Sequence, residues 1–315
     1  MKPAAAMSYN IKARNQGCHK LFVILCLLFT SLLLLPNAYG SSDETRDYIL
    51  WYRNYDSPAI RALVELALKE TPEYGAFRLV RSQELSQGRV LRELSRKQSR
   101  LVDIANVATA SERERFLTPI PIPVDGGLLG LRVCIVLPDK LPLFDGIHTL
   151  DDLKDAGIRI GQGIHWPDTP VLESSGIQVV THSRYEILFG MLRNERFECF
   201  ARGVSEVLYD LEIEQDPNLL VEPDLLIAYP MPSFLFVGPQ DQETAQRLQL
   251  GMERAINDGN FAGFLKDFYG RAIKVLNLDR RNIIVLDNPF LSEESHNIGR
   301  LTQEDLRRRL EVLSN

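Results

Sequence analysis

Polar and aromatic side chains follow several apolar, strand-like runs of this chain, and their types suit the binding of a small polar solute. A guanidinium group pairs with carboxylates, a hydroxyl donates and accepts hydrogen bonds, and an indole ring stacks on a flat solute. The carboxyl ends of parallel strands meet at one edge of a sheet, and α/β folds bind their ligands there. The candidates in such positions are Arg53, Asp56, Thr109, Ser111, Trp166, Asp168, Thr169 and Arg202.

The candidates near the amino-terminal strands also have a purely structural interpretation. Arg53 and Asp56 follow the run 47–52, where they could form a solvated turn and a helix cap. Thr109 and Ser111 offer hydroxyls that could cap the next helix instead of contacting a ligand. Both alternatives stay open from the residues alone.

Each candidate in the middle of the chain could have either of two roles. Gly161 and Gly163 would let the backbone approach a ligand closely, and Trp166 could cover that ligand or fill the core. Asp168 and Thr169 could face the ligand or cap the following helix, and for these two we favour capping.

The acidic residues near these positions do not predict catalysis. Glu198, Glu206 and Asp168 have no basic partner whose spacing demands acid–base chemistry. Ser205 lies in the segment Gly203–Val207, which lacks the closing glycine of a nucleophile elbow. We therefore expect a binding protein rather than an enzyme.

The histidines do not predict a metal site, because they share no metal-ligand spacing with one another or with the cysteines. Beyond residues 1–40 they are His148, His165, His182 and His296. We expect no metal and no cofactor.

The amino-terminal segment has the layout of a secretory signal peptide. Lys12 and Lys20 precede the uncharged apolar run 21–35, and small residues such as Gly40 close the segment. The run is shorter than the roughly 20 residues that a membrane-spanning helix needs, so a cleaved signal is favoured over an uncleaved anchor. We interpret residues 1–40 as the signal peptide and expect a periplasmic protein.

Cys134 and Cys199 are the two cysteines beyond that segment, and both lie in apolar, strand-like runs. We expect two buried free thiols, with a single disulfide as the alternative. The chain carries 36 Lys and Arg residues against 42 Asp and Glu residues. An acidic protein repels phosphate backbones, so nucleic acid is excluded as a partner.

The order of the first elements predicts an α/β fold with a parallel sheet covered by helices. Ile60, Leu63 and Val64 keep helical spacing after Ser57 and Pro58, which mark the start of a helix. The expected order is a strand at 47–52, a helix at 57–69, a strand at 76–80, a helix at 86–100 and a strand at 101–107.

A second α/β unit follows a proline-rich break at 119–123, and a second break at Pro230–Pro232 ends it. Its expected elements are a strand at 131–137, a helix at 149–157, strands at 158–160, 177–180, 197–201 and 225–229, and helices from 171, 183 and 204. Helices at 243–256 and 261–269 then return to the first unit, and the residues after Pro289 form a polar tail.

Three segments carry a resemblance to the type II periplasmic solute-binding proteins, near the amino-acid-binding family. Thr109–Arg113 followed by Phe116 and Pro119 resembles the family's signature after its third strand. Leu150–Gly163 is similar to the start of the family's second lobe, and Met191–Glu198 to a later helix-to-strand step. The likeness runs from about Asp47 to about Tyr269 and indicates an uncharacterised exported subgroup.

The resemblance implies a two-lobed α/β fold whose hinge consists of two crossover strands, near 131–137 and 229–236. The implied division is a signal peptide at 1–40, a first lobe at 41–132, a second lobe at 133–232, a return to the first lobe at 233–290 and a tail at 291–315.

The resemblance also assigns roles to two arginines. Arg113, or Arg115 if the loop is shifted, matches the arginine that grips a ligand carboxylate. Arg202 stands where amino-acid binders place an aspartate for the ligand ammonium, so a cation here would repel that ammonium and disfavour an ordinary α-amino acid. The alternative for Arg202 is an ion pair with Glu206, four residues further on.

The resulting expectation is a monomer that captures a small, carboxylate-bearing solute between two lobes, for ABC-type uptake or for sensing. A membrane permease or a sensor is the partner that this role implies. The alternatives are a dehydratase-like periplasmic enzyme on the same scaffold, and a scaffold that has lost its ligand.

Overall fold

The computed structural model describes residues 45–96 and 100–313 of the 315-residue chain. The segment interpreted as a signal peptide lies outside the described residues. Within the described part of the chain, no helix is both long enough and apolar enough to cross a membrane.

The first lobe is built on a five-stranded sheet with the order β2-β1-β3-β11-β4. Strands β1, β2 and β3 are parallel to one another, whereas β11 runs antiparallel to β3 and β4. The strands are β1 (Arg46–Leu50), β2 (Phe77–Arg81), β3 (Ile104–Ala108), β4 (Thr118–Ile120) and β11 (Ser233–Val237). The helical elements are α2 (Tyr52–Asp56), α3 (Pro58–Lys69), η1 (Pro72–Tyr74), α4 (Gln87–Leu94), α5 (Ser111–Phe116), α10 (Gln242–Asn257) and α11 (Asn260–Val275).

Helix α3 starts where the sequence predicts. The Ser57 side chain accepts a hydrogen bond from the Ile60 N–H, and Pro58 occupies the first turn. Helix α10 packs on α3 so closely that a Cβ at Gly251 would lie 1.9 Å from the Ala67 carbonyl oxygen. Only glycine fits at this crossing.

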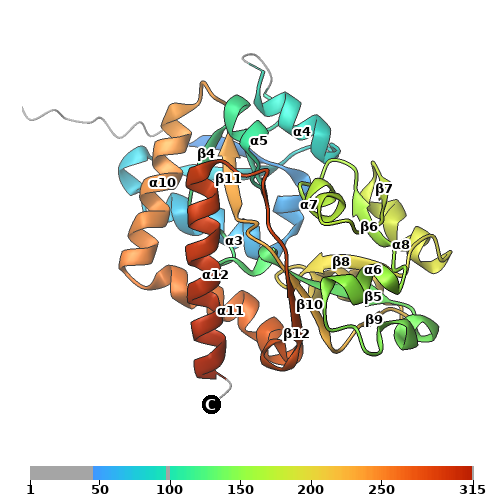
Figure 1. The fold of residues 1–315 in the computed structure, drawn as a ribbon. Coiled ribbons are helices and arrows are strands. Elements are labelled where there is room, and N and C mark those ends of the chain that lie inside the picture. The colour runs from blue at the N-terminus through green and yellow to red at the C-terminus, as the bar shows by residue number, and fades with distance from the viewer. Residues whose placement is uncertain (1–44, 97–99, 314–315) are drawn as a thin grey trace, which may run out of the picture. The chain divides into compact units, whose positions relative to one another are not determined.

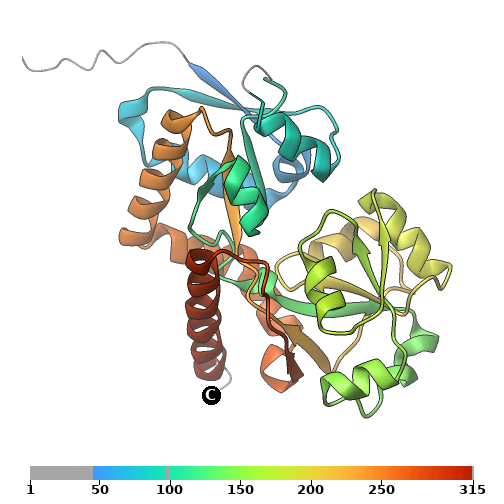
Figure 2. The same ribbon diagram turned by 45° about the horizontal axis from the view of Figure 1, so that its top comes forward.

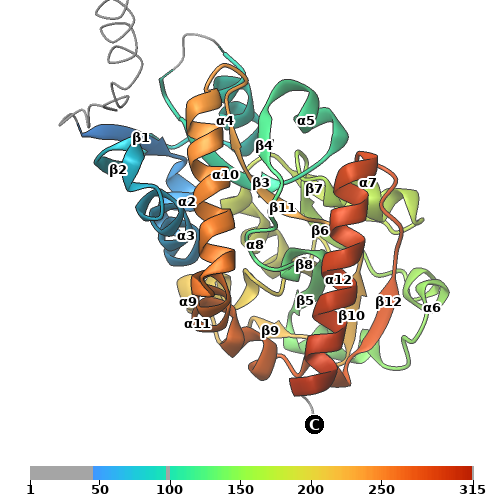
Figure 3. The same cartoon turned by 90° about the vertical axis from the view of Figure 1, so that its left-hand side faces the viewer.

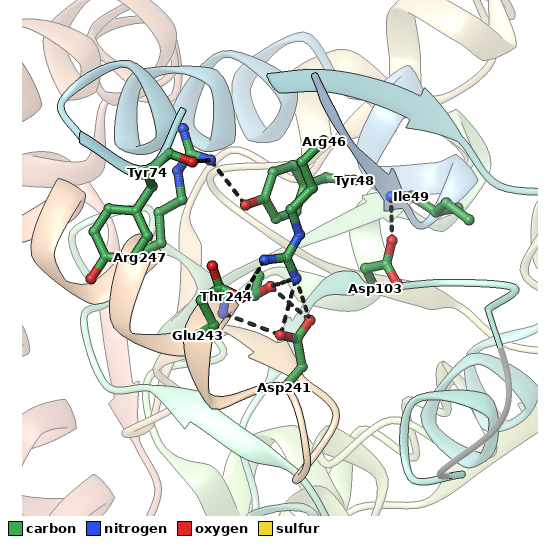
Figure 4. A network of polar contacts seen from close by, with 9 residues as sticks. All are labelled: Arg46, Tyr48, Ile49, Tyr74, Asp103, Asp241, Glu243, Thr244 and Arg247. Atoms are coloured by element: carbon green, nitrogen blue, oxygen red, sulfur yellow. Dashed lines mark hydrogen bonds and ion pairs between the residues drawn. The ribbon is translucent and has the colours of Figure 1, made fainter. Parts of the chain in front are cut away.

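A buried arginine fixes α10 to the first strand and to the turn after α3. Arg247 is 1% exposed and donates to the Tyr48 hydroxyl at 3.0 Å and to the Thr71 hydroxyl at 3.1 Å. Its other donors reach main-chain carbonyls, including that of Gly75 at 2.9 Å. Nearby, Arg46 donates to Asp241, which caps α10 (Figure 4). Both guanidiniums, of Arg46 and Arg247, are matched by acceptors of the protein itself, which makes the cluster structural.

The second lobe is built on a seven-stranded sheet with the order β12-β10-β5-β8-β6-β7, in which β9 also pairs with β5. Its strands are β5 (Leu131–Val136), β6 (Ile160–Gly163), β7 (Val179–His182), β8 (Cys199–Gly203), β9 (Leu220–Val221), β10 (Leu225–Ala228) and β12 (Asn282–Val285). Its helical elements are η2 (Leu128–Gly130), η3 (Pro138–Phe144), α6 (Leu150–Asp155), α7 (Asp168–Ser174), α8 (Tyr185–Arg193) and α9 (Val207–Glu214).

The described residues therefore form the two-lobed α/β fold that the sequence predicts. The chain passes from the first lobe to the second through η2 into β5, and it returns through Tyr229–Pro232 into β11. Figure 1 labels the elements, and the turned view in Figure 2 separates the lobe that carries α10 from the lobe that carries α8.

The carboxyl-terminal part differs from the expectation. We expected 282–285 in the first lobe, but β12 pairs in parallel with β10 in the second sheet. The polar tail is helix α12 (Glu293–Leu313), preceded by η4 (Leu278–Arg280). Helix α12 lies against the return crossing, because Gln303 donates to the Tyr229 carbonyl at 2.6 Å (Figure 3).

The prediction of two free thiols is wrong, because Cys134 and Cys199 form a disulfide. Strands β5 and β8 are antiparallel neighbours, and their register places Cys134 opposite Ala201. The two cysteines are therefore diagonal neighbours, with Cα atoms 5.0 Å apart. The disulfide joins the crossover strand to the middle of the second sheet.

Candidate functional site

A cavity of about 490 Å³ lies between the lobes, lined by residues of both. The first lobe contributes α2, the start of α3 and one face of α11. The second lobe contributes the start of α7 and α8, the end of β8, and α9. Five of the predicted site residues line this cavity, and they are Arg53, Asp56, Trp166, Asp168 and Arg202.

Arg53 is the cavity residue whose positive charge is available to a ligand. Its guanidinium carbon lies 4.0 Å from the centroid of the Tyr185 ring and 5.7 Å from that of Trp51. Among the described residues, no hydrogen bond or ion pair engages this guanidinium. The ring faces position the group while leaving its N–H donors open.

Asp56 is at the rim of the cavity and is already paired. Its two carboxylate oxygens accept from Arg81 at 2.6 and 2.8 Å, a bidentate ion pair. Its main-chain carbonyl accepts from the hydroxyl of Tyr209, which belongs to the second lobe, at 2.8 Å. Asp56 therefore contributes a contact between the lobes rather than a free charge.

Arg202 is buried and bound to two carboxylates. Its Nε donates to Asp210 at 2.6 Å, and its Nη2 lies 3.3 Å from a Glu206 oxygen. Burial alone would lower the pKa of Arg202, but the carboxylates of Asp210 and Glu206 outweigh burial and raise it. The ion pair with Glu206 is thus present. Because Glu206 and Asp210 neutralise the charge of Arg202, this arginine no longer argues against a ligand that carries an ammonium group.

Arg132, on β5, is a second buried guanidinium in the same wall. It lies 2.6 Å from an oxygen of Asp168 and 3.6 Å from one of Glu206. The hydroxyl of Tyr229, in the return crossing, donates to the same Asp168 oxygen at 2.6 Å. Asp168 thus faces the cavity and pairs with Arg132. The Nε of Arg132 is buried without a hydrogen-bond partner.

Trp166 belongs to both the core and the cavity. The Trp166 ring stacks on the ring of Phe200, with centroids 6.2 Å apart. The guanidinium carbon of Arg202 lies 4.9 Å from the centroid of the Trp166 ring. A Cβ at Gly163 would come 2.6 Å from the indole, so this glycine makes room for the tryptophan rather than for a ligand.

Arg113, the arginine that the family pattern selects, does not line the cavity. It donates to the carbonyls of Ala108 and His165, the latter at 2.7 Å. Burial lowers the pKa of Arg113 to about 10. It links the end of β3 to the second lobe. Arg115 is exposed and outside the cavity as well.

Three further candidates, Thr109, Ser111 and Thr169, lie outside the cavity lining and form hydrogen bonds with other parts of the protein. The Thr109 hydroxyl donates to Glu114 at 2.5 Å, and the main-chain N–H of Ser111 donates to the Phe290 carbonyl at 3.0 Å. The Thr169 hydroxyl donates to the Gly163 carbonyl at 3.1 Å.

Asp125 is a cavity residue that sequence reasoning missed. It is 3% exposed and accepts hydrogen bonds from the Ser205 hydroxyl at 2.7 Å and from the Gly127 N–H at 3.1 Å. Burial raises the pKa of Asp125, and these hydrogen bonds offset only part of that effect. In the sequence, Asp125 precedes two glycines ahead of the strand expected at 131–137, and nothing local indicates that its carboxylate faces a cavity.

Comparison with known proteins gives the fold a precedent. No protein-family model matches the sequence, and no curated protein is recognisably similar. An arginine-specific periplasmic binding protein from Salmonella typhimurium has a TM-score of 0.52 at 15% identity, over 71% of this chain and 100% of its own. An amino acid ABC transporter substrate-binding protein from Streptococcus pneumoniae, solved with L-arginine, has a TM-score of 0.52 at 12% identity. The match covers 71% of this chain and 94% of that protein.

A third structure is an ancestral amino-acid-binding protein described as a precursor of cyclohexadienyl dehydratase. It has a TM-score of 0.51 at 12% identity, over 71% of this chain and 95% of its own. At these identities the likeness shows the fold alone, which is the type II periplasmic solute-binding fold.

Proposed function

We propose that this protein is an exported solute-binding protein that holds a small, carboxylate-bearing solute in the cavity between its lobes. The observation that carries the proposal is Arg53, a cavity guanidinium with no acidic partner among the described residues. A planar guanidinium can donate two parallel hydrogen bonds to one carboxylate. The two buried arginines of the cavity, Arg132 and Arg202, already have carboxylate partners.

Contacts between the lobes at the mouth of the cavity support a closing motion. Arg271 on α11 lies 2.6 Å from Glu212 on α9, and the Tyr209 hydroxyl donates to the Asp56 carbonyl. Both contacts are exposed and join elements of different lobes, so they can break without uncovering a core. A ligand that touches both lobes would favour the closed form through its differential contacts.

The Cys134–Cys199 disulfide supports export, because disulfides persist in oxidising compartments such as the periplasm. The amino-terminal signal segment would direct the protein there, and its removal would release the mature protein. We propose that it acts as a monomer and presents its solute to an ABC-type permease or to a sensor. The neighbouring structures with binding roles are consistent with this assignment.

A thermal-shift screen of the purified protein tests the proposal. Carboxylates, amino acids, peptides and sugars would be compared at matched concentrations, since a ligand that binds only the folded state raises its apparent stability. We expect carboxylates to give the largest shifts and Arg53→Gln to reduce those shifts. Shifts given only by uncharged sugars, or carboxylate shifts of unchanged size in Arg53→Gln, would contradict the proposal.

A second candidate function is a dehydratase-like enzyme, and Asp125 favours it. A buried carboxyl whose pKa is raised, lying in a cavity, has the character of a general acid. One structural neighbour is described as a precursor of such an enzyme. Mass spectrometry of the stabilising compound after incubation separates the two candidates, because a binding protein returns it unchanged.

A further inference from the structure

The cavity has an apolar mouth, formed by three large side chains that line it and are nevertheless exposed. They are Tyr209 and Ile213 on α9 of the second lobe and Phe268 on α11 of the first lobe. The exposed fraction is 60% for Ile213 and 40% for Phe268. Single exposed apolar residues are ordinary, but several of them at one cavity are typical of a surface that another molecule covers.

The residues of the apolar mouth belong to one groove between two helices. Ile213 follows Tyr209 by four residues, so both lie on the same face of α9. Arg271, three residues after Phe268 on α11, lies 2.6 Å from Glu212 of α9, and the two helices are neighbours in Figure 3. This ion pair holds the helices together and neutralises the charges of Glu212 and Arg271, so the groove offers mainly apolar surface to a ligand.

The apolar mouth is continuous with the place of the Arg53 cation. Arg53 and Asp56 lie about one turn apart on α2, and the Asp56 carbonyl accepts a hydrogen bond from the Tyr209 hydroxyl at 2.8 Å. Ile213 lies one further turn along α9, and a helical turn is about 5.4 Å long. A solute that reaches from Arg53 past Tyr209 to Ile213 therefore needs a chain of several carbon atoms beyond its carboxylate.

We propose that the solute is amphiphilic, with its carboxylate on Arg53 and an apolar hydrocarbon tail between α9 and α11 at the apolar mouth. The inference rests on the proposed function and adds the uncharged part of the solute. Binding would remove the tail and the exposed surfaces of Ile213 and Phe268 from water together, which is the source of hydrophobic stabilisation. A short polar carboxylate would engage Arg53 and leave the apolar mouth uncovered.

The position of the apolar mouth favours a solute tail over a partner protein as its occupant. Its three residues line the same cavity as Arg53. Other exposed apolar residues, such as Ile256 on α10 and Val285 on β12, lie outside that lining. A tail between α9 and α11 would also touch both lobes, so it would favour the closed form through contacts that an open form lacks.

The test varies the tail and the head of the probe separately. Acetate, butanoate, hexanoate and octanoate lengthen the tail, octanedioate replaces the terminal methyl of octanoate by a second carboxylate, and octanamide replaces the carboxylate by a neutral amide. Calorimetric titration measures each Kd, with weak probes measured by competition. The proteins are the wild type, the double variant Ile213→Gln, Phe268→Gln, and Ile256→Gln as a matched control at a position that is 46% exposed and outside the cavity lining.

We expect the Kd of the wild type to fall about fourfold for each methylene group that the apolar mouth covers, so octanoate should bind more tightly than acetate. The double variant should weaken octanoate about tenfold and leave acetate unchanged. Octanedioate should bind less tightly than octanoate, because its second carboxylate would lie among apolar side chains. Ile256→Gln should match the wild type, and the single variants serve if the double variant fails to fold.

The possible failures point to different errors. Equal affinity of the wild type for acetate and octanoate, or full octanoate affinity in the double variant, would overturn the amphiphilic solute and give the apolar mouth another occupant, such as a partner protein. The proposed function would then stand, provided that Arg53→Gln weakens carboxylate binding. Octanamide binding as tight as that of octanoate would overturn the proposed function, although the apolar mouth would still bind the tail. Absence of binding by every probe would overturn both.

Discussion

The guanidinium carbon of Arg53 lies 4.0 Å from the centroid of the Tyr185 ring, and the two residues belong to different lobes. Tyr185 is itself anchored, because its hydroxyl donates to Asp210 at 2.5 Å and Asp210 pairs with Arg202. Burial, reinforced by the Asp210 carboxylate, raises the pKa of Tyr185 well above its ordinary value. The free cation of the first lobe thus rests on a ring that the buried charges of the second lobe hold in place.

Replacing Arg53 should weaken carboxylate binding in proportion to what is removed. Arg53→Gln loses the charge and should raise the Kd of the strongest carboxylate probe by about tenfold or more. Arg53→Lys keeps the charge but loses the planar fork and should fall between that variant and the wild type. Calorimetric titration measures both, and Arg92→Gln, on an exposed position of α4, is the control. Unchanged affinity in Arg53→Gln would exclude Arg53 from the site.

Removing Arg202 should destabilise the fold rather than only weaken binding. Arg202→Ala leaves Asp210 buried without its cation, which costs about 3–5 kcal/mol in free energy of unfolding. Arg193→Ala removes an ion pair at the surface with Glu214 and Asp216 and should cost about 1 kcal/mol or less. Urea unfolding measures the free energy of unfolding of both variants. Equal losses would mean that the buried ion pair stabilises the fold no more than the surface pair does.

Reducing the disulfide should lower the free energy of unfolding by about 2–5 kcal/mol. The measurement is urea unfolding with and without a thiol reductant. A Cys134→Ala, Cys199→Ala double variant is the control, because reductant should not affect it. Free-thiol titration of the denatured protein without residues 1–40, which contain Cys18 and Cys26, checks the premise under non-reducing conditions. Two reactive thiols in that protein would contradict the disulfide.

The charge on Asp125 should make the wild type lose stability relative to Asp125→Asn as the pH rises. Burial raises the pKa of Asp125 in the folded state above its ordinary 3.8. At a pH between 3.8 and the raised folded-state pKa, the folded protein therefore holds a proton that the unfolded protein has released. Stability therefore falls as the pH rises through that window, and it is level above the folded pKa. Because asparagine does not titrate, the free energy of unfolding of Asp125→Asn should increase relative to that of the wild type as the pH rises through this window.

The control for the pH series has the opposite sign. The hydrogen bonds from Arg78 lower the pKa of Asp47, so this carboxylate stabilises the fold above its unfolded pKa and loses that effect as the pH falls. Asp47→Asn should therefore fall behind the wild type as the pH rises. Urea unfolding between about pH 2 and 8 measures both differences, because the window of Asp47 lies below its ordinary pKa of 3.8 and the window of Asp125 lies above it. A flat difference for Asp125→Asn would show that the group carries no buried charge.

The fold was predictable because its signals are local. Ser57 and Pro58 start α3, and the Thr149–Asp152 capping box starts α6, each within a few residues of sequence. Helix α12 was not predicted, because its sequence is mostly polar and the contact that places it, Gln303 with Tyr229, joins distant segments.

The candidate site was only partly predictable, because its chemistry depends on pairings between distant strands. The sequence shows Arg202 and its neighbour Glu206, but not that the pairing of β5 with β8 brings Arg132 beside them. The same register decides the disulfide. Asp125 gave no local signal, since Ser205, which donates to its carboxylate, lies 80 residues further along the chain.

The most direct test of the account is a crystal structure of the protein with the carboxylate that stabilises it most. The account predicts density inside the interlobe cavity, with the ligand carboxylate within hydrogen-bond distance of the Arg53 guanidinium. A ligand bound outside the cavity, or one whose carboxylate pairs elsewhere while Arg53 contacts only Tyr185, would contradict it.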